Sequence, residues 1–190
     1  MVACLLLAAC GGGGESKDDS GLSPVETDVK LPGGAKFALK LKGPVEGGFD
    51  GEGIDRFERM LKRCVNPKGG ESGYGECSSG SDCAEGEVCK KPMKLGLNGV
   101  NDVCENFNLQ MVVPASEGET GTFGTIQTSS FTCKSTQYVT SEPIRLTIDE
   151  YGNGKLSGAL KGKFAHKRQG SDKTSVSPAL TFEGRFSFSY

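Results

Sequence analysis

The feature that most constrains the fold is a strict alternation of apolar and polar residues along positions 180–190. The apolar positions are Leu180, Phe182, Phe186, Phe188 and Tyr190. Thr, Glu, Arg and Ser occupy the positions between them, and Gly184 takes the one remaining place in the apolar series. Successive side chains of a strand point to opposite faces, so this pattern predicts a long strand with one buried and one solvated face.

The same period of two recurs along the chain. It appears at residues 36–42, 109–113, 144–148 and 156–164. Gly-x-Phe occurs at residues 121–123, 162–164 and 184–186, a combination that allows strands to bend while an aromatic ring covers the gap. These features predict a mainly β domain over residues 31–190, an antiparallel β-sandwich or small barrel of about seven or eight strands.

Two segments depart from this period. Between residues 54 and 65 the apolar positions follow a spacing of three and four, which predicts one short amphipathic helix: Ile54, Phe57, Met60, Leu61 and Cys64. Residues 66–104 are rich in Gly, Ser, Lys and Asp, and they contain four cysteines. Such a segment has too little apolar content to order itself, so it is predicted to be a disulfide-bonded insertion.

The N-terminal residues Leu7-Ala8-Ala9-Cys10 resemble the lipobox of bacterial lipoproteins. The resemblance implies cleavage before Cys10, acylation of this cysteine with palmitate-type chains, and a stable membrane anchor. Residues 1–9 would be the end of a signal peptide that begins further upstream, because a basic region is missing. Residues 10–30 are rich in Gly and charged side chains, so they are predicted to form a flexible tether. In the Gram-negative lipoproteins that this motif resembles, Asp directly after the cysteine favours retention in the inner membrane, so Gly11 at this position implies the outer membrane.

Removal of Cys4 and acylation of Cys10 would leave six cysteines: Cys64, Cys77, Cys83, Cys89, Cys104 and Cys133. An even set in an exported chain predicts disulfides, although the sequence does not fix the pairing. The Cys-x5-Cys-x5-Cys spacing at residues 77–89 resembles short disulfide-bonded modules of exported Gram-negative proteins.

Motifs for catalysis or cofactor binding are weak. His166 is the single histidine, and residues 70–74 lack the second glycine of a nucleophile elbow. No phosphate-binding loop occurs, and disulfides explain the cysteines better than zinc does. Residues 149–160 resemble the start of an EF-hand loop, but Asn153-Gly154 is more simply a hairpin turn. We therefore expect no enzyme activity, no cofactor and no metal.

Five lysines lie on the polar faces of predicted strands: Lys36, Lys40, Lys42, Lys161 and Lys163. If their strands are neighbours, they form a basic stripe able to meet anionic lipid or an acidic glycan. Exposed lysines that prevent edge pairing are the simpler explanation. A net charge of −2 makes nucleic acid an unlikely partner.

The hypothesis from sequence is a non-catalytic, lipid-anchored envelope protein that acts as a binding or structural module. Two alternatives stay open. One is an envelope enzyme of unknown type, in which any Ser/His or Cys/His mechanism would need His166. The other is an outer-membrane β-barrel component, since the aromatic strand ending at Tyr190 resembles the terminal strand of such barrels.

Overall fold

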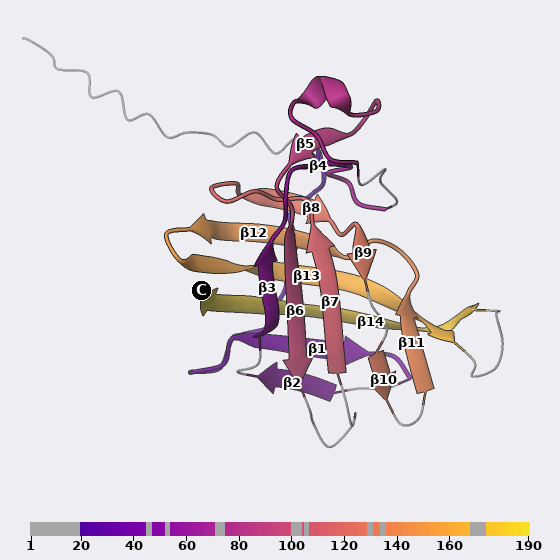
Figure 1. Cartoon of the computed structure of the whole chain (residues 1–190). Helices are drawn as coiled ribbons and strands as arrows, with labels where there is room; N and C mark the ends of the chain where they lie inside the picture. The colour runs from indigo at the N-terminus through magenta and orange to yellow at the C-terminus, as the bar shows by residue number, and fades with distance from the viewer. Residues whose placement is uncertain are drawn as a thin grey trace, which may run out of the picture.

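The computed structural model describes residues 20–44, 47–51, 54–70, 75–99, 104, 107–128, 131–133, 136–167 and 174–190. Within these residues the chain forms two antiparallel sheets packed face to face and a small two-stranded ribbon at one end (Figure 1). The predictions for the signal peptide and Cys10 lie outside the described residues.

The larger sheet has eight strands in the described part of the chain. They are β1 (Phe37–Lys42), β2 (Gly47–Gly51), β8 (Gly121–Gly124), β10 (Phe131–Cys133), β11 (Thr136–Thr140), β12 (Arg145–Gly152), β13 (Lys155–Lys167) and β14 (Thr174–Ser189). The order is β10-β11-β13-β14-β1-β2, and β12 pairs with β13 and β8. Because β14 occupies one edge of β13, β11 and β12 share the other edge.

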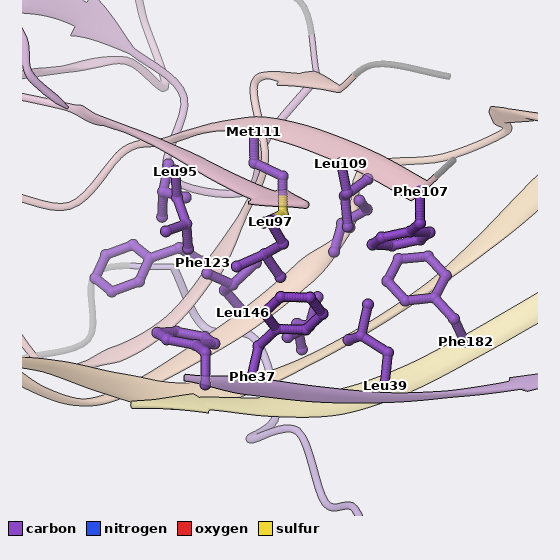
Figure 2. Close-up of a cluster of buried hydrophobic side chains, with 14 of the residues drawn as sticks. Phe37, Leu39, Leu95, Leu97, Phe107, Leu109, Met111, Phe123, Leu146 and Phe182 are labelled. Carbon is purple, nitrogen blue, oxygen red and sulfur yellow. The ribbon is translucent and has the colours of Figure 1, made fainter. Parts of the chain in front are cut away.

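The smaller sheet contains β3 (Ile54–Arg59), β6 (Met93–Gly99), β7 (Phe107–Val113) and β9 (Gln127–Thr128), in the order β3-β6-β7-β9. Its strands run across those of the large sheet (Figure 1). Figure 2 shows Leu95 and Met111 of this sheet facing Phe37 and Leu39 of the other. Among the described strands neither sheet closes on itself, so the predicted antiparallel β fold is confirmed as a sandwich.

The predicted alternation is confirmed in the strands that build this core. In β14, Leu180, Phe182, Phe186 and Phe188 are each at most 6% exposed. The predicted apolar positions of β1, β7, β12 and β13 are buried in the same cluster. Full burial of one such side chain contributes about 1.5–3 kcal/mol relative to exposure, so these positions dominate the stability of the fold.

Glycines in the large sheet make room for aromatic rings from the neighbouring strand. Gly162 lies opposite Phe182, and a Cβ at this glycine would come within 2.7 Å of the Phe182 ring. Phe164 stacks on the same ring, with centroids 4.6 Å apart. Gly158 and Phe186 form a second opposed pair. The aromatic that covers each glycine is therefore the cross-strand partner, which the Gly-x-Phe motif alone does not identify.

The helix predicted at residues 54–65 is wrong. Residues 54–59 form β3, which pairs with β6, and residues 63–65 form β4. The apolar positions match a helical face because the alternation is reset twice, by a bulge at residue 55 within β3 and by the break at residues 60–62. A lone helix of this length is marginally stable in water, whereas β3 gains a hydrogen-bonded ladder with β6. Leu61, in the break, is 68% exposed.

The insertion predicted at residues 66–104 contains a strand of the core. Met93, Leu95 and Leu97 of β6 alternate and are at most 1% exposed. The Cys-rich part is therefore confined to the connection between β4 (Arg63–Val65) and β5 (Val88–Lys90), which pair to form the small ribbon. The connection also contains η1 (Gly80–Asp82), the sole helical turn among the described residues.

The turn between β12 and β13 confirms the predicted hairpin. Gly152 pairs with Lys155, and the two residues between them, Asn153 and Gly154, have φ angles of 51° and 75°. Positive φ at both central residues is typical of the type I′ turn, whose twist matches the flanking strands.

Candidate functional site

The outer face of the large sheet carries charged side chains in register. Cross-strand pairing aligns two rows: Arg145, Lys161, Glu183 and Lys40 in one, and Lys163, Thr181 and Lys42 in the next. We call the five basic members the basic half of this face: Lys40, Lys42, Arg145, Lys161 and Lys163. The structure thus brings four of the five predicted lysines to one surface, with β14 between β1 and β13.

Only two members of the basic half form ion pairs within the described residues. Lys42 Nζ lies 3.3 Å from Glu183 Oε1, and Lys163 Nζ lies 3.5 Å from Glu142 Oε1. The other three basic residues are exposed and have no carboxylate partner in the described part of the chain. With the two carboxylates subtracted, this half of the face keeps an excess of three positive charges.

A row of mostly small residues borders the basic half. In register it contains Ala38, Arg185, Ala159, Thr147 and Thr122. Ala38 and Ala159 point away from the core, yet they are 6% and 2% exposed. Another part of the chain must therefore cover them.

Residues 20–32, which we call the strap, provide this cover. The Val25 N–H donates a hydrogen bond of 2.7 Å to Thr147 Oγ1 on β12, and Val25 is 8% exposed. Val29 lies beside β1 and β2. β12 and β1 are three strand spacings apart, or about 14 Å. The four residue steps from Val25 to Val29 also span about 14 Å in an extended chain. Part of the segment predicted as a tether therefore crosses the sheet in a nearly extended form.

At the far end of the strap is an open hollow of about 640 Å³. Its lining residues are Val29, Lys40, Leu41, Lys42, Gly47 and Gly48. Two members of the basic half thus border a concave surface.

Lys36 lies apart from the basic half. It is exposed, but it precedes β1 and pairs with Ser187, on the other side of the row that the strap covers. Its N–H donates to the Gly51 carbonyl and its own carbonyl accepts from the Ser187 N–H. The sequence pattern grouped Lys36 with Lys40 and Lys42 because it could not show that a segment of chain runs between them.

Two disulfides hold the connection between β4 and β5: Cys64–Cys83 and Cys77–Cys89. The Sγ atoms of Cys64, Cys77 and Cys83 lie within 4.8 Å of one another. All three are bonded in disulfides, and zinc requires thiolates, so this cluster is not a metal site in the oxidised protein. Cys104 is also disulfide-bonded. The Cys133 side chain lies outside the described residues, so its predicted bridge stays a prediction.

The loop at residues 66–70 fixes this Cys-rich connection to the sandwich. The Gly124 N–H donates to the Pro67 carbonyl, and the Gly70 N–H donates to the Thr125 carbonyl, both at 3.1 Å. A Cβ at Gly124 would overlap the Lys68 carbonyl oxygen, so the close approach requires glycine. A second apolar cluster lies beside the loop: Val65, Val112 and Ile126, with Met60 and Val88 packed against them.

The sequence did not reveal a cluster formed by Arg59, Glu117 and Tyr190. The Tyr190 hydroxyl donates to Glu117 Oε1 at 2.9 Å, and Arg59 Nη2 lies 3.0 Å from the same oxygen. The centre of the Tyr190 ring lies 5.1 Å from the Arg59 guanidinium and 4.4 Å from the centre of the Phe57 ring. These residues come from distant parts of the chain, and only the alternation that aimed Tyr190 at the core hinted at them.

Two tyrosines at this cluster are unusually weak acids. Burial raises the pKa of Tyr151 to about 12. Burial also raises the pKa of Tyr190, and its hydrogen bond to Glu117 adds to the effect. Both phenols therefore stay protonated near neutral pH. The cluster ties β3 and the turn at residue 117 to the end of β14.

The candidate catalytic residues lie largely outside the described structure. The backbone of His166 pairs with Tyr138 and Ser175 in the large sheet, and its side chain lies outside the described residues. Residues 71–74 of the failed nucleophile elbow also lie outside them. Within the described ranges, no helix is long and apolar enough to cross a membrane.

Comparisons with known proteins add no relative. No protein-family model, curated protein or solved structure matches the chain.

Proposed function

We propose that this chain is a non-catalytic binding module of the bacterial cell envelope, anchored in the outer membrane through lipids on Cys10. The Leu7-Ala8-Ala9-Cys10 sequence supports the anchor. The disulfides Cys64–Cys83 and Cys77–Cys89 support export, because such bonds form and persist in oxidising compartments.

One observation carries the binding role. Three exposed cations of the basic half, Lys40, Arg145 and Lys161, share one register row and have no carboxylate partner among the described residues. A rigid sheet holds them at fixed spacing, so several can contact one anionic surface together. Phosphate of anionic lipid and carboxylate or phosphate of an acidic glycan fit this chemistry.

The anchor is tested by detergent-phase partition of the protein expressed with its complete signal. The wild type is expected in the detergent phase, and Cys10→Ser is expected to stay unprocessed or move to the aqueous phase. Ser16→Ala, a neighbouring change that leaves Cys10 intact, serves as the control. If Cys10→Ser partitions like the wild type, the lipid anchor is disproved.

A further inference from the structure

The path of the strap determines the point at which the N-terminal segment of the chain joins the domain. Ser20 is 1% exposed, and Val25 is bonded to Thr147 on the outer face of the large sheet. The strap therefore begins on the β8–β12 side of this face and crosses toward β1 and β2. Any anchor joined through residues 10–19 would pull on the domain from this side.

The length of the preceding segment limits how the domain can sit. The ten residues from Cys10 to Ser20 span at most about 36 Å when fully extended. A domain of this size has a radius of gyration of about 15 Å, so it is about 40 Å across. To turn the outer face of the large sheet away from the bilayer, the segment would have to run around the domain almost fully extended.

Charge favours the same orientation. The basic half borders the strap and holds an excess of three positive charges over about three strand spacings, or about 14 Å. Beyond the basic half, Arg185 pairs with Asp149 and Lys155 pairs with Glu150. Lys36 adds one exposed cation without an ion pair among the described residues. The positive excess is therefore largest in the basic half.

We infer that the strap orients the anchored domain with the basic half against the bilayer that holds its lipid, and that the ligand is the phosphate of anionic phospholipid headgroups in this leaflet. The orientation rests on the proposed lipid anchor. The docking surface itself rests on the basic half alone.

Lysine footprinting of the lipidated full-length chain tests the orientation. The chain is inserted into vesicles of phosphatidylcholine, or of phosphatidylcholine mixed with phosphatidylglycerol, and its amines are acetylated and located by mass spectrometry. With phosphatidylglycerol present, acetylation of Lys40 and Lys161 is expected to slow several-fold, while Lys62 and Lys94 are unchanged. Equal rates at both pairs, or protection by an acidic glycan but not by these vesicles, overturn the inference.

Two strap variants test the role of residues 20–32. Ala159→Gln places a long side chain under the strap, and Thr147→Val removes the oxygen that accepts from Val25. Both should reduce the preference for Lys40 and Lys161 in the lipidated chain, because only the affinity of the basic half then orients the domain. Ser157→Gln, on the same strand and face, is the control. Circular dichroism reports folding, and an undiminished preference in either folded variant contradicts an orienting strap.

The unlipidated Cys10→Ser chain separates the two proposals. At low ionic strength it should sediment with phosphatidylglycerol vesicles, and binding should weaken as the Debye length falls from about 30 Å at 0.01 M salt to about 8 Å at 0.15 M. Lys40→Gln with Lys161→Gln should weaken it several-fold more than Lys62→Gln with Lys94→Gln. If the unlipidated chain binds in this way but the wild type carries no lipid, the docking surface is supported and the anchor is disproved. If the wild type is lipidated but the unlipidated chain does not bind, the anchor is supported and the docking surface is disproved.

Discussion

Loss of the Cys64–Cys83 disulfide should open the connection between β4 and β5 while the sandwich stays folded. The bond closes a loop with a sequence separation of 19 residues, so the chain-entropy model gives it about 3 kcal/mol. The connection has few other sources of stability. The buried Val65 contributes about 1.5–3 kcal/mol, the half-buried Val88 contributes less, and each backbone hydrogen bond contributes about 0.5–1.5 kcal/mol. A loss of about 3 kcal/mol is therefore a large part of its local stability.

The sandwich has an independent core. Its buried cluster contains no residue between 60 and 92 in the described structure. Cys64→Ala combined with Cys83→Ala should therefore give early tryptic cleavage within this connection, at an unchanged urea midpoint by far-UV circular dichroism. The variant is preferable to a reductant, which would also open the disulfide of Cys104. A midpoint lowered by the full amount, without early cleavage, would show that connection and sandwich unfold as one unit.

Three further predictions concern stability. Gly124→Ala should break two hydrogen bonds that hold the loop at residues 66–70, worth about 1–3 kcal/mol together, and so speed tryptic cleavage of the Cys-rich connection, whereas Gly75→Ala, whose added Cβ meets nothing within 4 Å, should be near neutral. The protonated Tyr151 phenol contributes stability that is complete below its unfolded pKa of about 10 and is lost as the pH rises toward its folded pKa of about 12, which melting temperature against pH will show. Asp82, whose pKa the Ser78 and Ser79 N–H groups lower, contributes stability above its unfolded pKa of about 3.9 that is lost at lower pH; Asp82→Asn should remove this acid dependence of proteolysis in the Cys-rich connection.

The strands were predictable wherever one face is buried and one is solvated. Residues 180–190 and the Asn153-Gly154 turn each carry a local rule, because side-chain period and positive φ depend on the chain itself. Register then places Phe182 over Gly162 and Lys161 beside Arg145, but register depends on partners that the local pattern does not name.

Other features depended on tertiary contacts. Residues 54–65 match a helical spacing, and only the ladder with β6 selects strands. The strand β6 itself was hidden by the cysteines and polar residues around it. The strap has no periodicity, so nothing in residues 20–32 indicates that they cross a sheet.

The surface proposed to bind anionic lipid was predictable only in part. The period of two placed Lys40, Lys42, Lys161 and Lys163 on outward faces, but strand order decides which of them meet. Arg145 belongs to the same surface because β12 places it opposite Lys161, and the strap separates Lys36 from these residues. A sequence pattern assigns a face within each strand, whereas a surface requires the order of strands and the path of every segment that crosses them.

The central claim is that Cys10 carries a lipid that holds this domain at the envelope. Its most direct test is the mass of the N-terminal peptide of protein purified from the membranes of a Gram-negative host that expresses it with a complete signal. The account predicts a chain that starts at Cys10 with a diacylglycerol on the thiol. A peptide that runs unmodified through Ala9 and Cys10 would contradict it.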